Sequence, residues 1–242
     1  MNLLKRYTNF FLLLFFKKKI IFKFKCLFTK VLCDFFYISP SRINIEKHIT
    51  HYFGKKYRGV FFEVGGADGI QWSNTYYLEN KLGWSGYLVE ANKYLFNMMK
   101  NNRPRCVNIN ALLSDKVDNK IFYNVGLSSF VSDSNSKNKK NDEIFFFNQF
   151  SYSENIEKLN LLSNTFKNLT IFYNIKKIDL LIIDVEDHEI QLIKGIDFNF
   201  TRIKILVIET KNIIEVQNLL NNYFKLDKKL IENNYIFKNI IF

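Results

Sequence analysis

The chain has 242 residues, which is enough for one sizeable α/β domain and too few for two ordinary domains joined by a linker. Its 48% hydrophobic and 24% charged residues are typical of a folded protein. The three cysteines, Cys26, Cys33 and Cys106, are too few and too scattered for a disulfide framework or a zinc site, so we expect a reducing, cytoplasmic compartment.

The positive charge is concentrated at the N-terminus. The net charge is +12, and residues 1–30 hold eight Lys or Arg and no acid, which leaves +4 for the rest (12 − 8). The apolar run 10–16 (FFLLLFF) is far shorter than the roughly 20 residues that span a bilayer, and it lacks the cleavage site of a secretory signal. Two alternatives stay open: residues 1–35 lie peripherally on the inner face of an anionic membrane, or they form a helix packed on the domain. We expect no nucleic-acid partner, because the basic residues stand among bulky apolar side chains.

From Gly59 onward, short apolar runs alternate with amphipathic stretches, which predicts β-α-β units around a parallel sheet. We expect strands at 60–64, 86–90, 106–110, 178–184 and 203–209, and a last pair near 223–226 and 235–240. Helices are expected at 74–82, 93–101, 189–194 and 213–222, with Ser73 capping the first and Gly83 ending it.

Two apolar runs without a polar interruption, 180–183 and 205–208, predict neighbouring central strands that are buried on both faces. The polar segment 128–143 is typical of a mobile loop. The sequence therefore predicts an N-terminal extension over residues 1–50 and one doubly wound α/β domain over residues 51–242.

The sharpest local feature is 60–69 (VFFEVGGADG), a buried strand that ends in an acid and runs into a glycine-rich turn. The turn holds three glycines: Gly65, Gly66 and Gly69. Such a turn lets the backbone approach a ligand closely. Ala67 occupies the second glycine position of the dinucleotide fingerprint, and no P-loop lysine follows, so phosphate cofactors are disfavoured. The next strand ends in Glu90, a carboxylate that can accept hydrogen bonds from both hydroxyls of a ribose. The glycine-rich turn together with the Glu90 carboxylate favours a nucleoside cofactor without a pyrophosphate.

Three consecutive motifs closely resemble the FkbM-type methyltransferases: 63–69 (EVGGADG), 73–79 (SNTYYLE) and 83–92 (GWSGYLVEAN). That family typically reads D-x-G-A-x-x-G, then S-N-T-x-x-L-E, then G-W-x-G followed by an acid and Asn. A second block, 178–189 (IDLLIIDVEDHE), is similar to the family's I-D-L-L-x-I-D-x-E-G-x-E. The resemblance covers about residues 57–240 and excludes the basic N-terminus.

The resemblance implies a Rossmann-like class I methyltransferase fold with a doubly wound, mostly parallel seven-stranded sheet, and S-adenosylmethionine as the cofactor. It implies methyl transfer to a hydroxyl oxygen of a small molecule or glycan, such as a surface-polysaccharide sugar. Glu63 stands where the family usually has Asp, and its longer carboxylate can still reach the amino group of the cofactor's methionine part. The implied cofactor-binding residues are Glu63, Gly65, Gly66, Gly69, Asn74, Glu90 and Asp115, and either Ala111 or Asp115 contacts the adenine edge.

A hydroxyl acceptor must lose a proton, and the catalytic candidates are Asp184, Glu186 and His188 at the end of the fourth central strand. No residue is assigned as a metal ligand, although a divalent cation held by these acids stays an alternative, as does His188 simply starting the next helix.

Asp187 replaces the family's glycine in the D-x-E-G-x-E motif. If that glycine has a positive φ, an aspartate there bears a conformational cost. This change keeps open a noncatalytic nucleotide-binding or scaffold protein on the same fold. An oxidoreductase that uses NAD is disfavoured by the missing second glycine.

Overall fold

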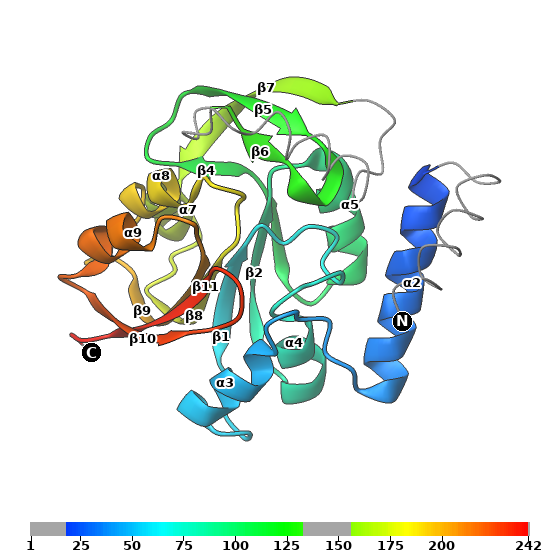
Figure 1. Ribbon diagram of the computed structural model, residues 1–242, viewed down its shortest axis with the longest axis horizontal. Helices are drawn as coiled ribbons and strands as arrows, with labels where there is room; N and C mark the ends of the chain where they lie inside the picture. The colour runs from blue at the N-terminus through cyan, green and yellow to red at the C-terminus, as the bar shows by residue number, and fades with distance from the viewer. Residues whose placement is uncertain (1–17, 133–155, 242) are drawn as a thin grey trace.

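The structure, a computed structural model, describes residues 18–132 and 156–241. Its centre is a seven-stranded sheet in the order β10-β11-β9-β8-β1-β2-β3 (Figure 1). Only β11 runs antiparallel to its neighbours, so the sheet is mostly parallel, as predicted. The strands are β1 Val60–Val64, β2 Ser85–Glu90, β3 Val107–Asn110, β8 Lys177–Ile183, β9 Arg202–Glu209, β10 Phe224–Lys229 and β11 Asn234–Asn239.

The two strands that are richest in aliphatic residues, β8 and β9, are neighbours in the middle of the sheet, which confirms the prediction from their apolar runs. Successive side chains of a strand point to opposite faces. Leu181 and Ile183 therefore join the core on one face, whereas Leu180 and Ile182 join the core on the other. This explains why a strand buried on both sides has no polar residue in its centre.

Helices cover both faces of the sheet. The face of Leu180 packs against α3 Ile45–Phe53, α4 Tyr76–Leu82 and α5 Lys93–Asn102, and the face of Leu181 against α7 Phe166–Phe172, α8 Glu189–Lys194 and α9 Ile213–Leu220. α4 begins at Tyr76, slightly later than predicted, and the Ser73 hydroxyl accepts a hydrogen bond of 3.1 Å from the Tyr76 amide. Gly83, at φ 69°, ends this helix as expected. α3 begins inside the expected N-terminal extension, and its Ile45 and Ile49 are fully buried in the core.

A second, smaller sheet crosses one end of the molecule (Figure 1) and was not predicted from the sequence. Its order is β4-β7-β5-β6, from β4 Leu112–Ser114, β5 Asn119–Asn124, β6 Phe130–Val131 and β7 Glu157–Thr165, with a short 3₁₀ turn at Gly126–Ser128. Most residues of β7 are polar, and its hydrophobic alternation is limited to Leu159 and Leu161, which pack against the buried cluster of the small sheet, while Leu162 is exposed. The described start of the predicted loop 128–143 contributes β6, and residues 133–143 lie outside the described residues.

The first described helix, α2 Lys18–Phe36, stands at the edge of the molecule (Figure 1). Phe22 and Cys26 pack against Leu95 of α5, and Cys33 packs against Ile70 and Tyr76. The described part of the N-terminal segment is therefore a helix packed on the domain, one of the two alternatives. In the described residues, no helix is both long and apolar enough to cross a membrane.

Candidate active site

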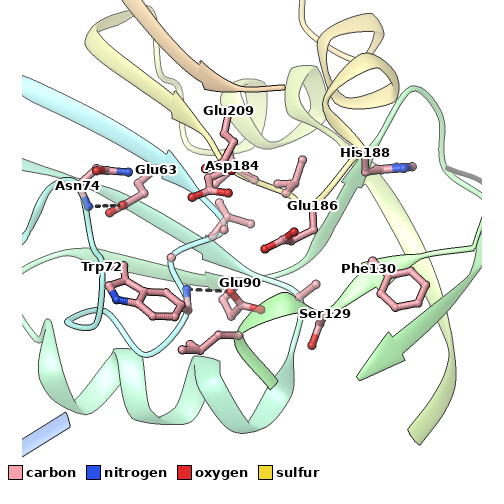
Figure 2. A pocket seen from close by; sticks show the side chains of 18 of the residues that line it. Glu63, Trp72, Asn74, Glu90, Ser129, Phe130, Asp184, Glu186, His188 and Glu209 are labelled. Atoms are coloured by element: carbon pink, nitrogen blue, oxygen red, sulfur yellow. Dashed lines mark hydrogen bonds between the residues drawn. The ribbon is translucent and has the colours of Figure 1, made fainter. Parts of the chain in front are cut away.

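A cavity of about 540 Å³ lies where the parallel strands end, beneath the smaller sheet (Figure 2). The wall includes the turn after β1, the last residues of β2 and β9, the segment that follows β8, and Phe130 of β6. Ligands in open α/β sheets bind at the carboxyl ends of the strands, and small-molecule sites occupy roughly 300–1,000 Å³. Location and size therefore both fit a small-molecule site.

The glycine turn after β1 approaches the backbone of β8 so closely that a side chain cannot fit between them. Gly65 has a φ of +89°, and a Cβ built on it would lie 1.8 Å from the carbonyl oxygen of Asp184. The amides of Gly65 and Gly66 both donate to the Val89 carbonyl at 3.0 Å, which fixes the turn against β2. Both glycines line the cavity.

Gly69, expected in the same site, is not among the residues that line the cavity. Gly69 has a φ of +82° and closes the turn, and its amide donates a hydrogen bond of 2.8 Å to the Gly66 carbonyl. A Cβ on Gly69 would come within 2.8 Å of Arg103 Cγ. The structure therefore gives this glycine a packing role behind the turn, and does not bring it to the cavity.

Glu90 ends β2 with its carboxylate held in place at the cavity wall. Oε2 accepts a hydrogen bond of 2.8 Å from the Ala67 amide (Figure 2), and Oε1 accepts one of 2.7 Å from the Asn92 amide. Burial raises the pKa of Glu90 to about 7, although the backbone amides oppose this shift. A buried, oriented carboxylate next to the glycine turn is the arrangement expected for a ribose contact.

Glu63 ends β1 and holds the segment that follows the glycine turn. Its Oε1 accepts a hydrogen bond of 2.9 Å from the Asn74 amide, and its Oε2 accepts from the hydroxyls of Ser73 and Thr75. Burial raises the pKa of Glu63. The Asn74 side chain accepts a hydrogen bond of 2.7 Å from the Ser41 hydroxyl, and both Glu63 and Asn74 line the cavity. The motif at residues 73–79 thus connects the cavity to the N-terminus of α4.

Behind this segment lies Arg103, which the sequence did not single out. Its side chain is 1% exposed and forms an ion pair with the buried carboxylate of Glu79. Its guanidinium also donates to the Gly69 carbonyl and to the Thr75 hydroxyl, both at 3.0 Å. An ion pair can be buried at acceptable cost only when the remaining donors are satisfied in this way. Nothing in the local sequence around Arg103 indicates this position.

The acids that follow β8 and end β9 meet in the middle of the cavity. Figure 2 shows Asp184 between Glu63 and Glu186, with Glu209 beside it. Burial, followed by the negative charges of Glu209 and Glu186, raises the pKa of Asp184 well above its usual range. The structure thus brings the candidates Asp184 and Glu186 together and adds Glu209. The position of Glu209 could also have been predicted from the sequence. It ends a central strand, and parallel strands place their carboxyl ends at one edge of the sheet.

His188, the third catalytic candidate, lines the cavity but is directed elsewhere. Its ring is 1% exposed, and its Nε2 lies 3.1 Å from the Ser114 hydroxyl of β4. In Figure 2 the imidazole points away from the carboxylates of Asp184 and Glu186. His188 is also the residue that precedes α8, which agrees with the helix-start alternative.

Asp115 is not among the residues that line the cavity. Its Oδ1 accepts a hydrogen bond of 2.9 Å from the Ser114 hydroxyl. The wall on this side is formed by Ala111, Leu112 and Leu113, so an apolar surface stands where a polar contact was expected.

Asp187 has the positive φ that was considered for the glycine at this position of the family motif. Its φ is +70°, and the preceding Glu186 has a φ of +53°. Asp tolerates this region better than most residues. Its carboxylate lies 3.2 Å from the Lys211 ammonium, so the loop keeps its shape with an ion pair in place of a glycine.

Three further residues at the cavity were not expected from the sequence: Arg42, Trp72 and Glu232. The Arg42 guanidinium lies 5.6 Å from the centre of the Trp72 ring and pairs with Glu232 at 2.7 Å. Trp72 lies beside the recognised motif 73–79, and its positive φ of 58° turns the chain there.

The cavity is strongly acidic. In the lining that the structure describes, six carboxylates face two cationic side chains: Glu63, Glu90, Asp184, Glu186, Glu209 and Glu232 against Arg42 and Lys211. Such a field disfavours a pyrophosphate and suits a ligand with positive charge. Within residues 18–132 and 156–241, no group of three or more His, Cys, Asp or Glu is arranged to hold a metal ion.

The fold is the Rossmann-like class I fold of methyltransferases that use S-adenosylmethionine. Its sheet has the order β3-β2-β1-β8-β9-β11-β10, with a glycine turn after β1 and an acid at the end of β2. Residues 63–237 match the Methyltransferase FkbM domain. This span is most of the chain, and the protein belongs to the FkbM methyltransferase family. No functionally curated protein shows significant sequence similarity to it.

Several solved structures are similar to this chain at low sequence identity. A putative caffeoyl-CoA O-methyltransferase from Staphylococcus aureus is 11% identical with a TM-score of 0.44, over 92% of this chain and 98% of that one. Ribosomal protein L11 methylase from Lactobacillus delbrueckii subsp. bulgaricus is 12% identical with a TM-score of 0.40, over 81% and 74%. A SAM-dependent methyltransferase from Aquifex aeolicus is 9% identical with a TM-score of 0.39, over 82% and 90%. The strand order, and not these scores, establishes the fold.

Proposed function

We propose that this methyltransferase transfers the methyl group of S-adenosylmethionine to a hydroxyl oxygen of a small molecule or glycan, with a surface-polysaccharide sugar as the representative acceptor. The observation that carries the proposal is Asp184, which lies in the cavity centre with a pKa raised by burial and by neighbouring carboxylates. A hydroxyl needs a proton acceptor during methyl transfer, whereas a neutral amine does not need one to attack.

The residues of the cavity fit the cofactor. The cavity borders the turn at Gly65 and Gly66, where the methionine part would lie, and the Glu90 carboxylate is held at its wall within reach of a ribose. The apolar wall of Leu112 and Leu113 suits a flat adenine ring. The excess of carboxylates complements a cofactor that carries both an ammonium and a sulfonium.

When bound, S-adenosylmethionine supplies an electrophilic methyl carbon on its sulfonium. The protein's contribution is placement, because a direct displacement needs the acceptor oxygen in line with that carbon. In our proposal the Asp184 carboxylate would accept the proton of the acceptor hydroxyl, and the cofactor bound at the glycine turn and Glu90 would supply the methyl group to the oxygen and leave as the neutral thioether. Burial first, and then the charges of Glu209 and Glu186, raise the pKa of Asp184, which suits a base that takes up a proton.

The cavity mouth supports a sugar as the acceptor. Trp72 offers a partly exposed indole face, with the Arg42 guanidinium above it. Glu232 and Asn233 add hydrogen-bonding groups at the same opening. An aromatic face with polar groups at its edge is suited to a ring that carries several hydroxyls.

The test measures transfer of a labelled methyl group from S-adenosylmethionine to glycan and small-molecule fractions by the purified protein. We expect a product whose label resists alkaline hydrolysis, since a methyl ether is stable in base and a methyl ester is not. Asp184→Asn should abolish transfer, whereas Glu215→Gln on the exposed face of α9 should leave it unchanged. Cofactor binding without transfer to any hydroxyl acceptor would favour the noncatalytic alternative.

A further inference from the structure

The helix α2 has two apolar faces, and only one of them is used by the domain. The inner face is buried and consists of Ile21, Phe22, Cys26 and Cys33. Phe22 and Cys26 pack on α5, and Cys33 packs on Ile70 and on Tyr76, the first residue of α4. A surface helix needs one apolar stripe for its fold, so a second stripe requires another explanation.

The second stripe faces outward and is continuous along the whole helix. Its members, spaced i, i+4, i+7, i+8, i+11 and i+15, are Ile20, Phe24, Leu27, Phe28, Val31 and Phe35. Each of these side chains is between 38% and 74% exposed. Phe36, Tyr37 and Ile38 extend the exposed apolar surface beyond the helix. Exposed patches of this size mark an interaction site.

The charges around the stripe are of one sign. Lys19, Lys23 and Lys25 are exposed on the same helix, and no acid precedes Asp34 in the chain. Asp34 itself is turned toward the domain, where its carboxylate accepts a hydrogen bond of 2.7 Å from the Tyr76 hydroxyl. The outward surface thus combines large apolar side chains with lysines and lacks a carboxylate, within the residues that the structure describes.

We propose that the outward face of α2 docks the protein on an anionic lipid surface, with the helix lying in the plane of the headgroups. Apolar side chains inserted at the boundary of the acyl chains and lysines near anionic headgroups are the two attractions that hold such helices. A second copy of the chain fits less well, because a symmetric contact would place the same lysines against each other without an acid to neutralise them. The proposal does not depend on the identity of the methyl acceptor.

The helix is also connected to the cavity wall. The Gln71 side-chain amide donates to the Cys26 sulfur at 2.8 Å, and both Gln71 and the adjacent Trp72 line the cavity. The docked face is therefore separated from the cavity wall by the thickness of one helix, about 10 Å. A domain held in this way would keep its cavity close to the lipid surface.

The experiment is sedimentation of the full chain with vesicles of phosphatidylcholine, with and without 30% phosphatidylglycerol, at low and at high salt. The variant F24Q/F28Q/F35Q removes three exposed phenylalanines from the stripe. The matched control F172Q/I214Q removes two side chains that are 78% and 71% exposed on α7 and α9. We expect the stripe variant to lower the partition coefficient on anionic vesicles at least about tenfold, and the control to leave it unchanged.

A charge variant, K23Q/K25Q, should also weaken binding to anionic vesicles and reduce its dependence on salt, because fewer lysines attract the surface. Unfolding by urea and the affinity for S-adenosylmethionine serve as folding controls, since all of the substituted side chains are exposed. Equal sedimentation of wild type and stripe variant would overturn the proposal. So would a wild-type dimer that becomes a monomer in F24Q/F28Q/F35Q without any vesicle binding, since the stripe would then be a contact between copies.

Discussion

At the scale of single residues, Glu90 joins cofactor binding to pH. Burial raises its pKa to about 7, and only its ionised form can accept hydrogen bonds from two ribose hydroxyls. We therefore expect the affinity for S-adenosylmethionine to fall as the pH drops below about 7. Glu90→Ala should weaken binding by about 1–3 kcal/mol at pH 8, because a charged acceptor is lost.

Titration calorimetry between pH 6 and pH 8.5 measures both effects. Glu90→Gln is the informative comparison, because it keeps the size of the side chain and removes its titration. If Glu90→Gln binds the cofactor as the wild type does at every pH, Glu90 does not contact the ribose.

The directions of their side chains distinguish Asp184 from His188 as the candidate base. The imidazole is held at Ser114 and points away from the acids, so His188 is poorly placed to remove a proton at the cavity centre. We expect Asp184→Asn to lower kcat by about 10²-fold or more, and His188→Gln to lower it by less than about tenfold. Single-turnover rates with the acceptor found in the methyl-transfer assay measure this difference. The reverse order of effects would make His188 the base.

Asp187 carries a measurable conformational cost. With a φ of +70°, Asp187→Gly should keep or raise the free energy of unfolding, whereas Asp187→Val should lower it by about 1–2 kcal/mol. Urea unfolding measures both variants. A stability loss in Asp187→Gly as large as that in Asp187→Val would show that the ion pair with Lys211, and not the backbone, decides the residue at this position.

At the scale of elements, Arg103 fixes the segment between the glycine turn and α4. Removing it leaves Glu79 buried without its main partner, so Arg103→Met should lower the free energy of unfolding by about 3–5 kcal/mol. Arg105 provides the matched control, because it pairs with the same carboxylate at 3.0 Å but is 64% exposed. Arg105→Met should cost less than about 1 kcal/mol. Similar losses in the two variants would contradict a special role for the buried guanidinium.

The elements also show what the sequence could and could not predict. β1, β8 and β9 were predictable, because central parallel strands carry apolar runs that few other structures tolerate. The small sheet was not, because β7 is mostly polar and only Leu159 and Leu161 pack against a buried cluster, while Leu162 is exposed.

Some of the candidate site residues could likewise be predicted from the sequence, and others could not. Asp184 and Glu90 were predictable because the position of a residue at a strand end determines where it lies. Asp115 lies in a chain reversal whose direction depends on the small sheet, and Arg103 depends on a tertiary ion pair, so neither has a local pattern that reveals its place.

At the scale of the whole molecule, the buried carboxylates of the cavity and of the start of α8 make stability depend on pH in an unusual direction. Burial raises the pKa of Glu90 to about 7 and that of Glu189 to about 8, and it also raises the pKa values of Glu63 and Asp184. Between pH 4.5 and 8 these four carboxyl groups therefore bind more protons in the folded chain than in the unfolded chain, and they outnumber His48, whose pKa is lowered by burial and which acts in the opposite sense. The free energy of unfolding falls with rising pH wherever this holds.

We expect the midpoint of urea unfolding, without cofactor, to be higher at pH 5.5 than at pH 8. The double variant Glu90→Gln and Glu189→Gln should flatten this dependence, because two of the groups that take up protons on folding are gone. Added S-adenosylmethionine should stabilise the protein more at pH 8 than at pH 5.5, since its positive charges then meet ionised carboxylates. A midpoint that rises steadily from pH 5.5 to pH 8 would mean that these carboxylates remain ionised in the fold, and that the cavity is wetter than its burial indicates.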